Sequence, residues 1–131
     1  MNKKPSLIVR LLAKSIDLII ILIFVEFLKA TGFFAGLLYV LIADGLFEGR
    51  SIGKYLTHLR VVKKDNLPAT TRESIIRNSP LFFALILIKI PFLGLFLGGA
   101  IILLELIMLI GSPKTTRLGD ELAGTEVVEI E

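Results

Sequence analysis

The sequence predicts an α-helical membrane protein with four transmembrane helices, or three as the alternative, and a small cytoplasmic β-hairpin or strand element. Two observations support this fold class. Apolar residues make up 54% of the 131 residues, against about 45–50% in soluble domains, and the mean hydropathy is +0.81. These residues are gathered in long runs, whereas a soluble fold spreads them at helix or strand period. The length predicts a single domain over residues 1–131.

The first apolar run predicts a helix over about 7–28. Crossing the hydrocarbon core takes about 20 helical residues, which this run supplies. A cleaved signal peptide is the alternative, but the run is too long and lacks a small-x-small cleavage site. Thr31-Gly32 predicts a tight turn, and a second helix is expected over 33–48. The two helices should form an antiparallel hairpin.

The next segment, 49–74, is polar and basic and is predicted to be cytoplasmic. Between Glu48 and Ser79 there are seven basic residues against three acidic ones. The N-terminal stretch is also basic, so an even number of crossings should separate the two. Within the segment we expect a strand over Leu56–Lys63 and a turn at Lys64–Asn66, because Asp and Asn tolerate left-handed backbone angles.

The second half of the chain holds a 30-residue apolar stretch from Leu81 to Ile110. Lys89-Ile90-Pro91 interrupts it, and proline disrupts a helix and disfavours helical angles in its predecessor. We therefore expect two spans, over about 75–90 and 92–110, rather than one long tilted helix. Four spans in total return the tail, 111–131, to the cytoplasm.

The tail predicts a short helix and then a strand. The helix or turn is expected over Arg117–Ala123 and the strand over Thr125–Ile130. With the tail in the cytoplasm, Val127-Val128 should pair with Arg60–Val62. This pairing would place Glu126 and Glu129 near Arg60, Lys63 and Lys64.

Three carboxylates within the apolar runs are the ion- or proton-binding candidates: Asp17, Asp44 and Glu105. A charge at the bilayer centre costs about 2.5–3.5 kcal/mol on insertion scales, so each needs a partner, water or a proton. Asp17 is the most informative, because it lies half-way along the first helix. The structural alternative is a buried carboxyl paired with a cation. Asp44 should pair with Lys54 or Arg50, or cap its helix, and Glu105 should face the bundle interior.

Arg10 lies seven residues before Asp17 on the same helix face, roughly 10.5 Å away along the axis. Because helix side chains lean toward the N-terminus, Asp17 should lean toward Lys14 and Arg10 toward the cytoplasmic surface. We therefore predict that Arg10 pairs with Asp120 and holds the tail against the first helix. Reversing both charges together should restore the stability lost in each single reversal.

The composition excludes several kinds of site. With no cysteine and one histidine, His58, the chain has neither thiolate nor multi-histidine metal sites. Ser6, Ser15 and Ser51 form no nucleophile–base arrangement with it, so we expect no enzyme, metal or cofactor. The pI of 9.3 is explained by basic cytoplasmic loops, and no nucleic-acid partner is expected. Gly49–Lys54 is similar to a phosphate-binding loop, but it is one residue short, Tyr55 replaces Ser or Thr, and no strand precedes it.

Three ordered motifs resemble the RDD family of integral membrane proteins, named for one arginine and two aspartates. They are Arg10-x-x-Ala13-x-x-x-Asp17, the middle segment from Gly49 through Arg77, and the tail from Arg117 through Val128. The resemblance implies that Arg10, Asp17 and Asp120 are the name-giving residues. Asn66 departs from the family, which often has glycine there. Most members look like membrane proteins of unassigned activity; sodium–proton antiport is associated with some, but does not transfer by fold alone.

Two functions follow as hypotheses. The first is cation or proton transport by an oligomer, in which Asp17 binds the ion and Glu105 or Asp44 relays it. The alternative is a non-catalytic membrane subunit or scaffold whose basic cytoplasmic surface binds protein partners or anionic lipid. The expected location is the inner (cytoplasmic) cell membrane, multi-pass, with both termini cytoplasmic. The expected partners are the lipid bilayer and a second copy or another membrane protein.

Overall fold

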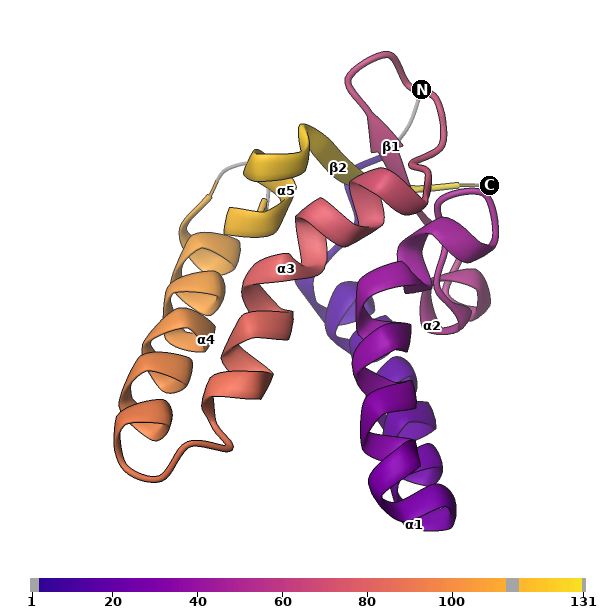
Figure 1. Ribbon diagram of the computed structural model, residues 1–131. Helices are drawn as coiled ribbons and strands as arrows, with labels where there is room; N and C mark the ends of the chain where they lie inside the picture. The colour runs from indigo at the N-terminus through magenta and orange to yellow at the C-terminus, as the bar shows by residue number, and fades with distance from the viewer. Residues whose placement is uncertain (1–2, 113–115, 131) are drawn as a thin grey trace.

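The computed structural model describes residues 3–112 and 116–130 and is mostly helical, with one small sheet (Figure 1). Four helical arms form two hairpins, and the short elements gather where the hairpins meet. The elements in chain order are α1 (Leu7–Leu46), α2 (Ile52–Leu56), β1 (Leu59–Lys63), α3 (Thr71–Leu87), α4 (Leu93–Gly111), α5 (Leu118–Ala123) and β2 (Thr125–Glu129).

The first hairpin is α1 itself, which reverses direction at Lys29 (φ 52°, ψ −121°). The sequence correctly predicted a hairpin but wrongly placed its turn at Thr31-Gly32. Gly32 instead lies within the second arm, where an added Cβ would overlap the carbonyl oxygen of Phe24. Glycine is therefore needed for the close approach of the two arms. The second arm ends at Leu46, two residues before the predicted end at 48.

The second hairpin is formed by α3 and α4, which are separated at Lys89–Pro91 as predicted. Their bounds differ from the predicted 75–90 and 92–110 mainly at the start of α3. This helix begins at Thr71 because Thr70 and Glu73 form a capping box, in which the Thr70 N–H donates to Glu73 Oε2 at 2.8 Å. The side chain of Glu73 thus satisfies an N-terminal donor that the helix leaves free.

The sheet has the predicted strand pairing. β1 and β2 are antiparallel, with Arg60 opposite Val128 and Val61 opposite Val127. The strand begins at Leu59 rather than Leu56, because α2 extends to Leu56. Asn66 has a φ of 62°, which confirms the predicted turn after β1. A small core lies beneath the sheet and includes Ala13, Leu59, Val61, Ala69 and Val127.

The strand register brings Glu126 and Glu129 close to the basic residues of β1, as the predicted pairing implied. Glu126 lies opposite Val62, and Glu129 lies opposite Leu59. The ion pairs of β1 in the described part of the chain are local ones: Arg60 pairs with Glu48 at 3.4 Å, and Lys63 pairs with Asp65 at 3.8 Å.

All short elements and both described ends of the chain gather at one end of the molecule, which we call the polar end (Figure 1). Lys3 forms a β-bridge with Glu129, so the two ends of the chain lie side by side. The hairpins diverge from the polar end, and their tips are at Lys29 and around Phe92. The polar end is therefore the only place among the described residues where α1, α2, α3, α4, α5 and the sheet come together.

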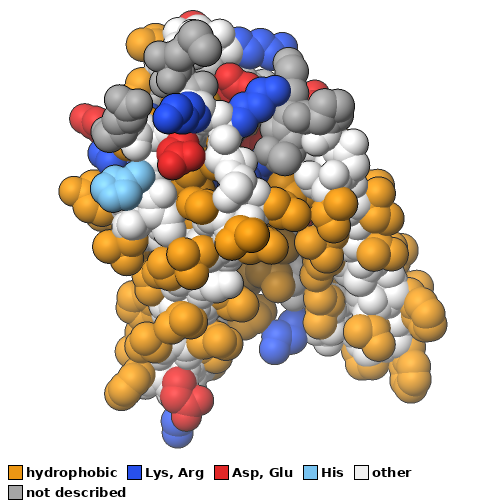
Figure 2. All heavy atoms as spheres, turned by 180° about the vertical axis from the view of Figure 1, so that it is seen from behind, with side chains coloured by type: hydrophobic (Ala, Val, Ile, Leu, Met, Phe, Trp, Pro, Cys, Tyr) orange, Lys and Arg blue, Asp and Glu red, His pale blue; other side chains and the backbone are white. Residues whose placement is uncertain are grey.

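Hydrophobic side chains cover the outside of both hairpins, while charged side chains gather mainly at the polar end (Figure 2). Leu22 is 56% exposed and Phe96 is 77% exposed. Soluble monomers rarely expose continuous apolar surface of this extent. Within the described residues, α4 alone is both long and apolar enough to cross a membrane by itself. The other arms are shorter or interrupted by charges, so the four-span count remains a prediction.

Replacing Gly32 with alanine should destabilise the first hairpin, because the new Cβ overlaps backbone that cannot rotate away. The expected loss is about 1–3 kcal/mol, as for other overpacked sites. Thermal unfolding in detergent measures it. Gly99→Ala is the matched control, since nothing lies within 4 Å of its added Cβ. Equal melting temperatures for the two variants would contradict the tight approach of the arms.

Candidate functional site

Buried polar side chains form a cluster at the polar end, where both hairpins meet α2 and α5. Burying charge is costly unless each group is paired or hydrogen-bonded. The side chains come from segments far apart in the sequence, so the pairings connect separate elements. The cluster consists of Arg10, Asp17, Asp44, Lys54, Arg77, Asn78, Glu105 and Asp120, with Arg117 at its edge.

Arg77 on α3 is the central cation of this cluster and is 1% exposed. Its Nη1 lies 3.1 Å from Asp44 Oδ2 on α1, and its Nε lies 2.7 Å from Asp120 Oδ1 on α5. One guanidinium thus joins the second arm of α1 to the tail. Sequence reasoning counted Arg77 only among basic residues of the middle segment and the family motif. The signal that it missed is the spacing of Ser74, Arg77 and Ala84, which places them on one buried helix face.

The Asp44 side chain, on α1, has three partners on two other elements, α2 and α3. It pairs with the Lys54 ammonium of α2, as predicted, and with Arg77. It also accepts a hydrogen bond from Asn78 Nδ2 at 3.1 Å. Burial lowers the pKa of Lys54, and the charge of Asp44 opposes that shift. Asp44 therefore joins α1, α2 and α3.

Asp120 forms an ion pair with Arg10, which confirms the predicted contact. Arg10 Nη2 lies 3.4 Å from Asp120 Oδ2. The backbone N–H of Arg117 also donates to Asp120, at 3.0 Å. Burial alone would raise the pKa of Asp120, but the charges of Arg77 and Arg117 outweigh it and lower the pKa. The structure adds Arg77 and Arg117 as further partners of Asp120, which changes the outcome expected of a double charge reversal. Reversing both charges should not restore stability, because an arginine at position 120 would face Arg77 and Arg117.

Glu105 on α4 is buried, as predicted, and it holds the start of α5. Arg117 Nη1 lies 3.3 Å from its Oε2, and the Gly119 N–H donates to its Oε1 at 3.2 Å. An added Cβ on Gly119 would overlap the carbonyl oxygen of Arg77. Only glycine lets α5 lie this close to α3. The Arg117-x-Gly119-Asp120 segment is therefore a docking motif for the tail.

In the described part of the chain, Asp17 forms no hydrogen bond or ion pair with Lys14, toward which it was expected to lean, although the two charges attract each other. Its carboxylate accepts hydrogen bonds from Tyr39 Oη at 2.7 Å, Ser51 Oγ at 2.6 Å and the Gly53 N–H at 2.9 Å. All three donors are neutral. Gly53 belongs to the start of α2, and Ser51 is the residue that caps this helix. The carboxylate also lies at the positive end of the α2 dipole. Tyr39 and Ser51 had not been identified as partners from the sequence.

The same contacts explain the segment that is similar to a phosphate-binding loop. Gly53 must be glycine, because an added Cβ would overlap the carbonyl oxygen of Ala13 on α1. Ser51 caps α2 by accepting from the Lys54 N–H at 3.3 Å. The other free N–H groups at this helix start are also satisfied by the chain itself: the Gly53 N–H donates to Asp17, and the Ile52 N–H donates to Tyr39 Oη. The segment docks α2 onto α1.

Each candidate carboxylate is thus engaged by donors of the chain itself. Asp44 and Glu105 are held by cations, and Asp17 is held by neutral donors. In the described part of the chain, no group of three or more acidic or histidine side chains is placed to hold a metal ion. What the arrangement does chemically is to fasten α1, α2, α3, α4 and α5 together at one end.

A model of the RDD family matches residues 26–124 of the sequence. The chain belongs to the RDD family. Members of this family are typically membrane proteins. The matched range includes Arg77 and Asp120 but begins after Arg10 and Asp17, so these two are placed in the family signature by motif resemblance. No match was found among curated proteins or among solved structures.

Removing the Arg77 guanidinium should cost this RDD protein more stability than any change at an exposed arginine. In Arg77→Met, two buried carboxylates lose a cation, and breaking a buried pair costs about 3–5 kcal/mol. The matched control is Arg72→Met, an exposed position on the same helix, expected within about 0.5 kcal/mol of wild type. Denaturant unfolding in detergent measures both. Equal stability of the two variants would contradict the central position of Arg77.

Proposed function

We propose that this RDD protein is a non-catalytic, multi-pass subunit of the cytoplasmic membrane that binds other membrane components. In this proposal four helical arms span the bilayer and the polar end faces the cytoplasm. One observation carries it: the carboxylates that a transporter or enzyme would need are engaged by the chain's own donors. The polar cluster then fastens the helices, and the open surfaces between and around the hairpins do the binding.

The arrangement of the chain supports four spans. Both described ends and the polar middle segment lie at the polar end, and both hairpin tips lie away from it (Figure 1). α3 has 17 residues and α4 has 19, within the range of about 17–25 for a spanning helix. The excess of basic residues at the polar end supports its cytoplasmic location, because Lys and Arg collect in cytoplasmic loops.

The ion pairs support a fastening role for Asp44 and Glu105 over ion binding. A cation entering at either carboxylate must displace Lys54, Arg77 or Arg117. Separating such a buried pair costs about 3–5 kcal/mol, because it leaves an uncompensated charge behind. The exchange would also release α2 or α5 from the helices that they hold.

A second candidate function is cation or proton transport at Asp17, within an oligomer. The observation that favours it is that the three groups that donate hydrogen bonds to Asp17 are neutral. Its protonation would break no ion pair. The Asp17 side chain also lines a groove between the hairpins, together with Leu18, Tyr39 and Asp44.

Ion flux separates the two functions. Wild-type protein in liposomes loaded with proton- and sodium-sensitive dyes should show no flux above empty liposomes, because Asp17, Asp44 and Glu105 are all engaged by donors of the chain itself. Flux that Asp17→Asn abolishes and the exposed Glu26→Gln preserves would support transport and overturn the proposal. Melting temperatures of both variants show whether a loss reflects unfolding.

Single cysteines test the topology, since the natural chain contains none. A membrane-impermeant thiol reagent added to intact cells should label Ala30→Cys and Phe92→Cys at the two hairpin tips. It should label Asp65→Cys, in the turn after β1, only after lysis. External labelling of Asp65→Cys, or labelling of the two tips on opposite sides, would contradict four spans.

A further inference from the structure

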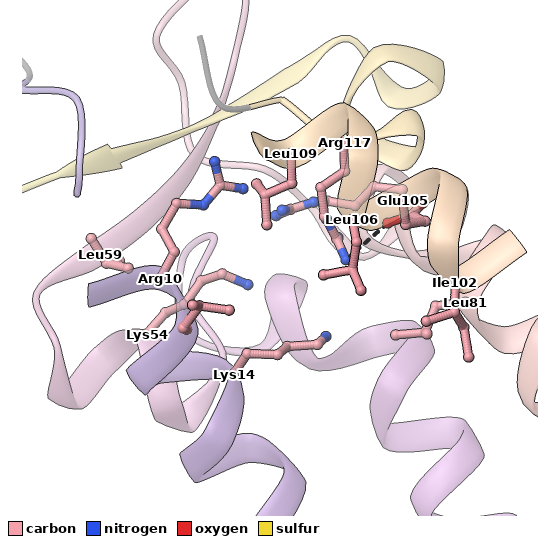
Figure 3. Close-up of a pocket in the computed structure, with 12 residues that line it drawn as sticks. Arg10, Lys14, Lys54, Leu59, Leu81, Ile102, Glu105, Leu106, Leu109 and Arg117 are labelled. Carbon is pink, nitrogen blue, oxygen red and sulfur yellow. Dashed lines mark ion pairs between the residues drawn. The ribbon is translucent and has the colours of Figure 1, made fainter. Parts of the chain in front are cut away.

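A cavity of about 240 Å³ lies within the polar cluster, bordered by both hairpins (Figure 3). Its charged lining is almost entirely basic, with Glu105 as the one acidic side chain on its wall. The cavity alone is smaller than the usual ligand pocket of about 300 Å³ or more. Its basic lining residues are Arg10, Lys14, Lys54, Arg77 and Arg117.

The positive charge here exceeds the negative charge. The five cations face the carboxylates of Asp44, Glu105 and Asp120, and a surplus remains even when Asp17 is counted. Four of the cations form ion pairs. Lys14 forms no hydrogen bond or ion pair with the described residues, and Asp44 and Asp17 attract it only from a greater distance. Figure 3 shows the Lys14 ammonium directed into the cavity. Lys14 is therefore the surplus charge.

The cavity continues into an apolar groove of about 360 Å³ between the hairpins. Lys14 and Leu81 line both spaces, so the two adjoin at these residues. Below Lys14 the groove wall is aliphatic and aromatic, and Figure 2 shows the surface hollowed between the hairpins. Its apolar lining includes Leu18, Ile21, Leu22, Val25, Phe33 and Leu85.

We propose that this composite site binds an anionic phospholipid, with the headgroup phosphate at Lys14 and one acyl chain in the groove. Charge complementarity supports the headgroup position, because a phosphate would offset the one cation of the cavity that forms no ion pair with the described residues. The order of the two spaces supports the acyl chain position, since the apolar groove runs from the cluster toward the hairpin tips, along the proposed spans. The inference rests on the proposed membrane-embedded function and names the ligand of its open surface.

Lipid binding to purified protein in a neutral detergent tests this site. Native mass spectrometry with added phosphatidylglycerol should show tighter binding than with phosphatidylcholine. Lys14→Gln should reduce that preference by roughly fivefold, from the attraction of about 1 kcal/mol per basic residue. Lys64→Gln removes an equal charge from an exposed position outside the cavity and should retain the preference. Because Lys14 forms no internal pair, its variant should fold normally without lipid.

Three further arms complete the test. Leu85→Trp keeps Lys14 but obstructs the groove, so it should weaken the binding of both phosphatidylglycerol and phosphatidylcholine. Inorganic phosphate at the same concentration should not raise the melting temperature as phosphatidylglycerol does; an equal rise would overturn the lipid assignment in favour of a free anion. A lipid-free dimer that excludes phosphatidylglycerol would overturn it in favour of a second copy. If wild-type protein showed no preference for phosphatidylglycerol, while its topology and its lack of ion flux were as proposed, this lipid site alone would be overturned.

Discussion

The contact of Arg77 with both Asp44 and Asp120 organises the polar end of this protein. Its two carboxylate partners, Asp44 on α1 and Asp120 on α5, are 76 positions apart in the sequence. In a low-dielectric interior each buried charge needs its partners to offset the cost of its burial. The cluster therefore stabilises the fold only when all its members are present. From Asp44 the pairing continues to Lys54 on α2, and from Asp120 to Arg10 and Arg117. Glu105 joins through Arg117 and so includes α4.

Close backbone approach is the second requirement of this arrangement. Gly53 lets α2 lie against α1, and Gly119 lets α5 lie against α3. At both places a helix start directs its N–H groups at a carboxylate, Asp17 or Glu105. The glycines and the carboxylates thus act together, because a side chain at either glycine would move the donors out of hydrogen-bonding distance.

Fastening at one end leaves the hairpins free to diverge from one another. Among the described residues, the groove that begins at Lys14 is lined by α1 and α3. The buried carboxylates Asp44 and Glu105 are held by cations from other elements. The proposed binding role therefore rests on the groove and on the exposed surfaces of the hairpins.

The sequence by itself determined the helical class, the presence of two hairpins, the break at Pro91, the pairing of β1 with β2 and the contact of Arg10 with Asp120. These follow from local or periodic signals: long apolar runs, Pro91, the turn at Asn66 and the lean of helix side chains. The tertiary structure alone decided which donors reach Asp17, and it revealed that Arg77 lies at the centre of the cluster. Both depend on close backbone approach at glycines, and a linear pattern shows a glycine without showing what lies against it. The turn at Lys29 was missed for the same reason, since Gly32 is required for packing against Phe24 rather than for the reversal of the chain.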